Sequence, residues 1–218
     1  MSRPIILIHG AWHGGWCFDR VSSPLRDQGY DVLAPDLPFT GAADDVAFAR
    51  EIVSQHPGAV VLGHSYGGYV ITAACSGLDV SNLVYLCAFV GETEDDRTDA
   101  NSSAALAAAI VPADGKLSVD VDKGKDVFYQ DCPADAVELA KENVRPMVLA
   151  GIPALDVEPA WKTIASTYVV CTEDRAILEQ DQRKLARRCS NIVEWPLSHS
   201  PFFARPELMV ELLADLAN

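Results

Sequence analysis

Short apolar runs alternate with longer amphipathic segments along most of the chain. Each run is bounded by polar residues, glycine or proline and is short enough for a strand that is buried on both faces. The six runs are Ile5–Ile8, Val32–Leu33, Val60–Leu62, Leu83–Ala88, Tyr168–Cys171 and Ile192–Trp195. The predicted helices are about Phe18–Gln28, Asp44–Gln55, Tyr66–Cys75, Ala176–Arg188 and Pro206–Leu216. This alternation predicts an α/β fold, with a mostly parallel sheet of about six strands and helices on both faces.

The stretch from about 91 to 160 breaks this alternation. It has no clear strand pattern, an alanine-rich run at Ala104–Ile110, and 15 acidic against 6 basic residues. It is either a disordered acidic insert or a small helical cap over the carboxyl end of the sheet. Its many apolar residues favour the cap, because disordered segments are poor in them. We therefore expect one domain over 1–218, with a core of 1–90 and 161–218 and a cap inserted after the fourth predicted strand.

Composition excludes several classes of protein. The 218 residues are 49% hydrophobic and 22% charged, which is ordinary for a globular domain. The formal charge of −14 disfavours nucleic acid and anionic membrane surfaces as partners. No apolar stretch approaches the length of a membrane span. The run Ile5–Ile8 ends in His9-Gly10, so it resembles a buried strand more than a signal peptide.

The cysteines favour a cytoplasmic protein with reduced thiols. Six cysteines would allow three disulfides, but Cys75, Cys87 and Cys171 lie in apolar runs, where cysteine acts as a small hydrophobic residue. There is no C-x-x-C pair, so the sequence predicts neither a zinc site nor a redox motif.

The most informative motif is Gly63-His64-Ser65-Tyr66-Gly67, a G-x-S-x-G sequence. It follows a predicted strand and precedes a predicted helix. A serine on such a tight turn adopts strained backbone, and the flanking glycines leave room for it. The motif therefore predicts a serine nucleophile at Ser65.

Further polar residues follow other predicted strands, where the ligands of an open parallel sheet bind. His199 comes after the last strand, and Glu173 and Asp174 come after the fifth. In enzymes with this kind of serine turn, the serine, the acid and the histidine typically follow one another along the chain in this order. His199 is therefore the predicted base. The acid is Asp174 or Glu173, with Glu92 or Asp95 as more remote alternatives.

An ester carbonyl attacked by serine also needs donors for the developing oxyanion. The backbone amide of Tyr66 is one predicted donor, and that of Ala11, in the glycine-rich turn after the first strand, is the other. A phosphate site in this turn is disfavoured, since the spacing of the known phosphate-binding glycine motifs is absent. His9 and His64 are expected to be structural, and His13 either structural or close to the pocket. Aromatic residues are candidates for an apolar substrate pocket, and Trp12, Phe128 and Phe202 are the ones we select.

Together these segments resemble the α/β-hydrolase fold, and most of all its branch of plant methyl esterases, hydroxynitrile lyases and related bacterial esterases. The resemblance rests on His9–Phe18, Gly63–Gly68, Val170–Ile177 and Ser198–Phe202. It implies that the acid is Asp174 and that Ala11 is the outer oxyanion donor. Compared with the family, the chain is short and begins at what would be the third strand.

Two positions separate this chain from the lyases that it resembles. Those lyases pair a threonine at the position of Ala11 with a lysine directly after the histidine, where this chain has Ser200. The differences favour a carboxylic ester hydrolase that acts through an acyl-enzyme, with no metal and no cofactor. The expected partner is a small-molecule ester, and a homodimer stays open. A carbon–carbon lyase, a low-turnover ligand receptor, and a cofactor-free oxygenase or perhydrolase are the alternatives.

Overall fold

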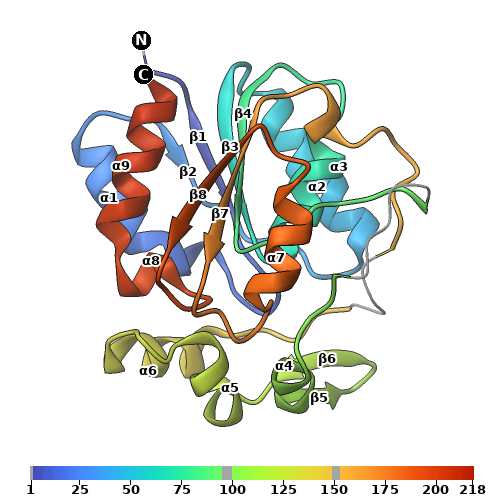
Figure 1. Ribbon diagram of the computed structural model, residues 1–218, viewed down its shortest axis with the longest axis vertical. Coiled ribbons are helices and arrows are strands. Elements are labelled where there is room, and N and C mark those ends of the chain that lie inside the picture. Colours follow the sequence, from blue (N-terminus) through green and yellow to red (C-terminus); the bar gives the residue numbers. More distant parts are fainter. Residues whose placement is uncertain (1, 95–99, 149–152) are drawn as a thin grey trace.

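The computed structural model describes residues 2–94, 100–148 and 153–218 of the chain (Figure 1). A six-stranded parallel sheet in the order β2-β1-β3-β4-β7-β8 forms its centre. The strands are β1 (Ile5–Ile8), β2 (Val32–Leu33), β3 (Ala59–His64), β4 (Val80–Leu86), β7 (Ser166–Cys171) and β8 (Asn191–Trp195). The predicted α/β architecture is thus confirmed.

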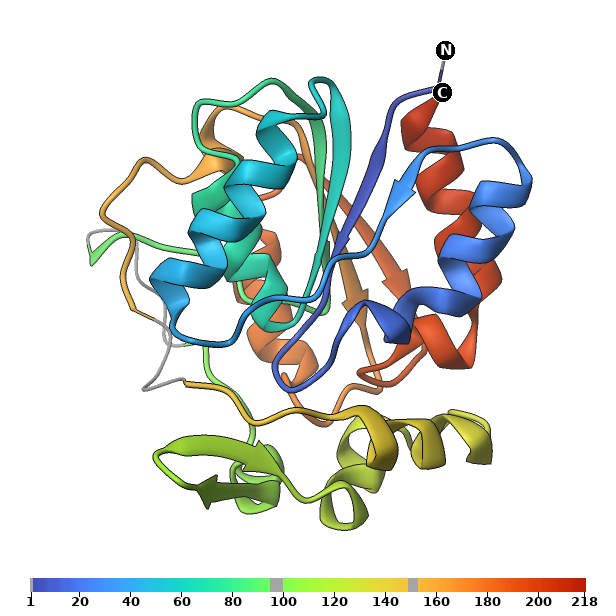
Figure 2. The same ribbon diagram turned by 180° about the vertical axis from the view of Figure 1, so that it is seen from behind.

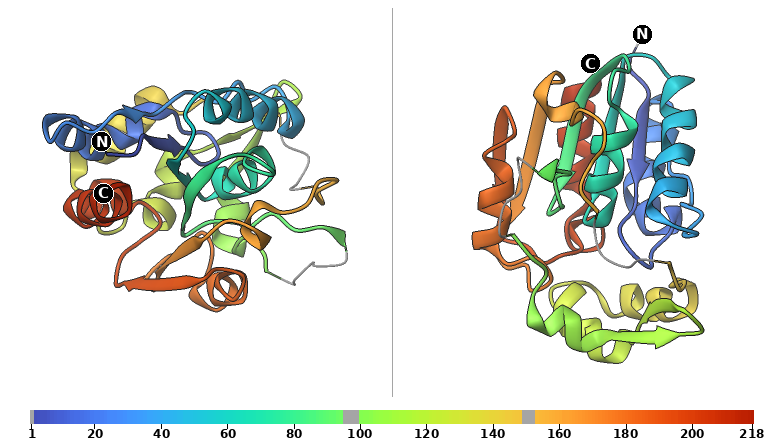
Figure 3. Two further views of the ribbon diagram at one scale, coloured as in Figure 1. Left: turned by 90° about the horizontal axis from the view of Figure 1, so that it is seen from above. Right: turned by 90° about the vertical axis from the view of Figure 1, so that its right-hand side faces the viewer.

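Helices cover both faces of the sheet, so the central strands are apolar throughout. All four residues of β1 and all six of β3 and β7 are buried. The helices α1 (Asp19–Asp27) and α9 (Pro206–Ala217) pack side by side on one face (Figure 2). On the other face lie α2 (Ala42–Ser54), α3 (Tyr66–Ala74) and α7 (Glu179–Ala186) (Figure 3). Within the described ranges the core also contains short helices, among them η1 (Gly15–Phe18), η3 (Ala160–Lys162) and α8 (Pro201–Ala204).

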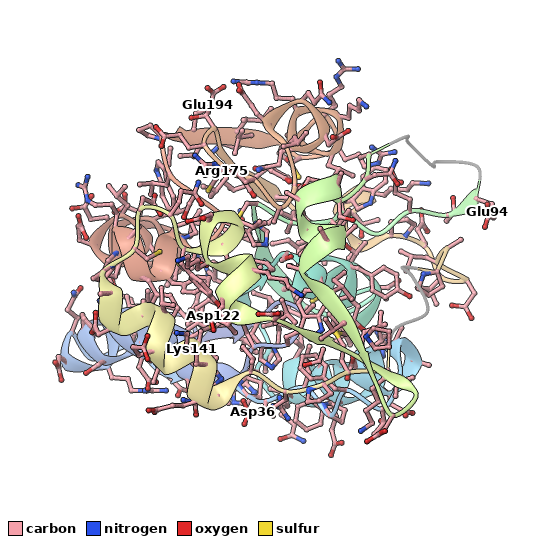
Figure 4. All side chains as sticks on the ribbon, turned by 90° about the horizontal axis from the view of Figure 1, so that it is seen from below. Asp36, Glu94, Asp122, Lys141, Arg175 and Glu194 are labelled. Carbon is pink, nitrogen blue, oxygen red and sulfur yellow. The ribbon has the colours of Figure 1, made fainter. Side chains whose placement is uncertain are left out.

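A separate layer lies across the carboxyl ends of the strands, at the end opposite the two termini (Figure 1). It corresponds to the predicted cap and contains α4 (Ala104–Ala109), β5 (Ile110–Ala113), β6 (Lys116–Val119), α5 (Val121–Phe128) and α6 (Ala134–Asn143). On its outer surface Asp122 of α5 and Lys141 of α6 form an ion pair of 2.9 Å (Figure 4). The interpretation of this stretch as a disordered acidic insert is therefore wrong for the described cap residues.

The cap is not helical throughout, although the sequence of this stretch has no clear strand pattern. Strands β5 and β6 form an antiparallel hairpin, with Ile110 opposite Val119 and Ala113 opposite Lys116. The turn between them is Asp114-Gly115, and both residues have positive φ, 46° and 77°. Asp-Gly suits such a turn because aspartate tolerates, and glycine readily adopts, the left-handed region. The Asp-Gly pair thus indicates a hairpin here, although the pattern of apolar and polar residues does not indicate its strands.

The predicted helix Ala176–Arg188 begins three residues late, at Glu179. The amides of Ala176 and Ile177 instead donate to Oδ1 of Asp174, at 2.6 and 3.1 Å. These bonds form a turn that holds the carboxylate, and the helix begins only after it.

Two absences follow from the described part of the chain. Residues 2–94, 100–148 and 153–218 contain no helix that is both long and apolar enough to cross a lipid bilayer. All six cysteines belong to these ranges, and each one is a free thiol.

Candidate active site

Ser65 occupies a strained turn between β3 and α3. Its φ of 51° and ψ of −119° lie outside the regions that residues with a side chain normally adopt. The turn is also tightly packed, since a Cβ atom on Gly67 would collide with the carbonyl oxygens of Ile8 and His9. Only glycine fits at that position, as the G-x-S-x-G motif predicts.

Three predicted residues from distant parts of the chain meet in one chain of hydrogen bonds. Nε2 of His199 lies 3.0 Å from Oγ of Ser65, and Nδ1 of His199 lies 2.7 Å from Oδ2 of Asp174. A carboxylate accepts, so Nδ1 carries the proton and Nε2 is left to accept from the serine hydroxyl. All three residues are buried, with exposed fractions of 9% for Ser65, 4% for Asp174 and 1% for His199. Such an arrangement can transfer the serine proton to the imidazole.

The other candidate acids lie elsewhere. Glu173 is exposed. Its backbone amide donates to the carbonyl oxygen of Leu197, and its carbonyl oxygen accepts from Nε2 of Gln130. Glu92 forms an ion pair with Arg188. Asp95 falls outside the described residues. The geometry therefore brings Asp174 to the imidazole, as the resemblance implies.

The two predicted oxyanion donors belong to segments that lie next to the serine. Tyr66 is the first residue of α3, so its amide belongs to the helix N-terminus, where amides lack partners within the helix. The loop after β1 passes close to the serine, since a Cβ atom on Gly10 would lie 3.0 Å from Cβ of Ser65. Ala11 follows in this loop, and Ala11, Ser65 and Tyr66 line the same cavity.

This cavity has a volume of about 390 Å³ and lies between the sheet and the cap. Its described walls are mostly apolar, and the lining residues are Ala11, Trp12, Ser65, Tyr66, Phe89, Val90, Glu92, Ala100, Asn101, Ser102, Leu106, Ile110, Leu117, Pro153, Ala154 and Leu185. Glu92 is the one charged residue among these, and Arg188 neutralises it. A cavity of this size and polarity suits an uncharged organic molecule.

Of the three aromatic residues selected for the pocket, only Trp12 lines this cavity. Phe128, at the end of α5, has its ring 5.7 Å from that of His199 and packs beside the imidazole. Phe202 belongs to α8 and packs beneath the site, with its ring 5.0 Å from that of His64 and 5.3 Å from that of Phe18. Helix α8 begins directly after Ser200, and this path of the chain directs the ring of Phe202 into the core.

The structure adds residues that the sequence did not identify. Nε2 of Gln182 on α7 donates to Oδ2 of Asp174 over 2.9 Å, and Gln182 is fully buried. The hydroxyl of Tyr66 donates to the buried carboxylate of Asp45 over 2.8 Å. Neither contact carries a sequence signal, because each joins residues on different elements through ordinary side chains.

The histidines expected to be structural are buried and hydrogen-bonded. Nε2 of His64 lies 2.8 Å from the carbonyl oxygen of His199 and so holds the backbone of the predicted base. Burial lowers the pKa of His64 well below its usual range and that of His9 to about 3. Both rings therefore stay neutral, and that of His64 lies 4.7 Å from the imidazole of His199.

Among the described residues, one group has the composition of a metal site. Ligand atoms of His64, Cys87 and His199 lie within 4.8 Å of one another. Both ring nitrogens of His199 are already hydrogen-bonded, and burial raises the pKa of the Cys87 thiol well above its usual range. A protonated thiol is a poor metal ligand, so the state of these three side chains does not favour a metal site.

Comparisons with known proteins agree with this architecture. A family model described as the alpha/beta hydrolase family matches residues 5–212. A pyrethroid hydrolase of Sphingobium wenxiniae is 29% identical, over 98% of this chain and 87% of the relative. Methylesterase 2 of Arabidopsis thaliana is 24% identical, over 100% of this chain and 97% of the relative. A crystal structure of a methylesterase from Arabidopsis has a TM-score of 0.80 at 20% identity, covers 98% of each chain, and supports the fold. The names of the sequence relatives support the predicted esterase.

Proposed function

Because this chain belongs to the alpha/beta hydrolase family, we propose that it is a carboxylic ester hydrolase with Ser65 as its nucleophile. The observation that carries the proposal is the buried hydrogen-bond chain from Ser65 through His199 to Asp174 at the wall of an apolar cavity. The names of the sequence relatives support the same reaction class.

In the first half of the reaction, Oγ of Ser65 attacks the ester carbonyl while Nε2 of His199 takes its proton. Asp174 holds the imidazole in the required tautomer and stabilises the imidazolium. The carbonyl oxygen becomes an oxyanion, which the amides of Ala11 and Tyr66 stabilise. The intermediate then collapses, and His199 gives its proton to the departing alcohol.

In the second half, water attacks the acyl group on Ser65 while His199 takes a proton from it. The same oxyanion donors act again, the carboxylic acid leaves, and Ser65 regains its proton from His199. The ester itself is expected to be uncharged and largely apolar, since the described cavity walls offer one carboxylate that is already paired with an arginine.

Replacement of Ser65 tests the proposal. We expect Ser65→Ala to abolish hydrolysis of p-nitrophenyl butyrate and to prevent labelling by a fluorophosphonate, with a melting temperature close to that of the wild type. Ser54→Ala, on an exposed turn of α2, is the matched control and should keep both properties. Hydrolysis retained by Ser65→Ala would contradict the assignment. Cyanide release from a cyanohydrin at a rate equal to or above ester cleavage would favour the lyase instead.

A further inference from the structure

Three parts of the cap hold the loop that carries Ala11. Nε1 of Trp12 donates to the carbonyl oxygen of Leu117 on β6 over 3.1 Å. The amide of Arg145, after α6, donates to the carbonyl oxygen of Trp12 over 2.8 Å. Tyr129, after α5, contacts the ring of His13 through its hydroxyl. Trp12 itself has a positive φ of 64°, so the loop adopts a conformation that its surroundings must maintain.

The contacts of His13 fix the direction of its hydrogen bonds. Nδ1 lies 2.8 Å from the carbonyl oxygen of Ala11, and a carbonyl only accepts, so Nδ1 carries the proton. Nε2 is therefore an acceptor, and the hydroxyl of Tyr129, 2.7 Å away, is its donor. Burial lowers the pKa of His13 to about 4, which keeps the ring neutral and the direction of both bonds unchanged near pH 7.

A second histidine holds the preceding peptide unit. Nε2 of His9 accepts from the amide of Leu37 over 2.9 Å, so its Nδ1 carries the proton and donates to the carbonyl oxygen of Gly10 over 2.9 Å. That carbonyl shares its peptide plane with the amide of Ala11. The peptide units before and after Ala11 are thus each fixed by a buried imidazole, and the one after it is connected to the cap through Tyr129.

We propose that Tyr129 and His13 are positioning residues that orient the amide of Ala11 for the oxyanion, so that the cap helps to assemble the active site. The proposal rests on the proposed esterase function. It assigns the cap a role in rate as well as in enclosing the substrate, because loss of the Tyr129 hydroxyl would remove one of the contacts that hold the loop with the oxyanion donor.

Tyr129→Phe tests this with the smallest possible change. The ring keeps its packing against Phe128 and Phe203, and only the hydroxyl is lost. Complete loss of one oxyanion donor lowers kcat by about 100-fold to 1000-fold. A misplaced donor should cost less, so we expect kcat to fall about 10-fold with KM within about two-fold of the wild-type value.

Tyr85→Phe is the matched control. Its hydroxyl is also buried and lies 2.9 Å from Oγ1 of Thr72, inside the core and on a different element from the oxyanion loop. Both variants should lose stability to a similar degree, but Tyr85→Phe should keep the wild-type kcat. Equal kcat values for the two variants would overturn the proposal.

A transition-state mimic separates positioning from a merely structural role. A trifluoromethyl ketone adds to a serine nucleophile and forms an oxyanion, so its affinity for Tyr129→Phe should fall by the same factor as kcat. If Tyr129→Phe does not fold, the pair His13→Asn and His13→Leu gives the same test. Asparagine can still donate to the carbonyl of Ala11 and should retain more kcat than leucine, and equal losses would contradict the proposal.

The outcomes also separate the two proposals. Hydrolysis that survives in Ser65→Ala would contradict the esterase mechanism itself. Inactive Ser65→Ala together with a fully active Tyr129→Phe would contradict only the role of Tyr129 and His13.

Discussion

Gln182 donates a hydrogen bond of 2.9 Å to the oxygen of Asp174 that also faces His199. The orientation of the Gln182 amide is fixed, since its Oε1 accepts from the amide of Cys171 over 2.9 Å and its Nε2 also donates to the carbonyl of Ile177 over 2.7 Å. A neutral donor on this oxygen orients the carboxylate and moderates its charge. Through this contact, helix α7 helps to hold the carboxylate of Asp174 in place.

Gln182→Met should therefore impair catalysis through Asp174. We expect kcat/KM to fall about 10-fold, in line with the loss of a hydrogen bond to a charged group. Without the donor, the Asp174 carboxylate is less well oriented toward His199, so the loss should lie in kcat rather than in KM. Gln180→Met, exposed on the same helix, is the control, and an unchanged kcat in Gln182→Met would limit Gln182 to a packing role.

The adjacent acids Glu173 and Asp174 allow a direct comparison. Asp174→Asn should lower kcat/KM by about 1000-fold to 10,000-fold, because an amide at this position favours the wrong tautomer of His199. Glu173→Gln should have little effect, since this side chain is exposed. Rates of p-nitrophenyl butyrate hydrolysis check both variants at equal protein concentration, and the reverse order would move the acid to Glu173.

Much of this architecture could be predicted because buried parallel strands are continuous apolar runs and bound ligands lie at their carboxyl ends. Both rules are local, so they locate Ser65 and His199 from the sequence alone. These two rules could not choose between Glu173 and Asp174. The two side chains differ only in the side of the turn that each one faces. That choice depends on the amides of Ala176 and Ile177, which bind the Asp174 carboxylate.

The rest depends on contacts between distant segments. Tyr129 and His13 are 116 residues apart and meet only when the cap lies on the loop after β1. Phe202 is an aromatic residue of the kind that lines apolar pockets, but helix α8 directs its ring into the core. No pattern in the sequence predicts that direction. The cavity walls combine residues from the core and the cap, so their placement follows from tertiary structure.

Asp45 should make the stability of the protein depend on pH. Burial raises the pKa of this carboxyl above its ordinary value of 3.8, although hydrogen bonds from Tyr66 and Phe39 oppose the shift. An acid with a raised pKa binds more protons in the folded state, so its contribution to the free energy of unfolding falls as pH rises through the raised pKa. Relative to the wild type, Asp45→Asn should therefore gain stability as the pH rises above about 4.

Urea unfolding at a series of pH values measures this difference. Asp44→Asn, on the exposed side of the same helix, controls for the loss of one negative charge. A difference between Asp45→Asn and the wild type that does not change with pH would mean that Asp45 keeps its ordinary pKa in the folded protein.

Leu106 gives a test of the cavity as the substrate site. It reaches the cavity from cap helix α4 and is 6% exposed, so a larger side chain there would occupy space that the substrate needs. In Leu106→Trp we expect kcat/KM to fall at least 10-fold for p-nitrophenyl octanoate and to stay within about three-fold for the acetate. Overpacking should also cost about 1–3 kcal/mol of stability, so unfolding is measured in parallel.

The ratio of the two esters carries this last test, because a general loss of folded protein lowers both rates equally. Leu139→Trp, on α6 and away from the cavity walls described above, is the control and should leave the ratio unchanged. If the cavity holds the alcohol part of the ester, the same selective loss should occur in a series of acetates with alcohols of increasing size. Rates in both series that remain independent of chain length would show that the substrate binds outside this cavity.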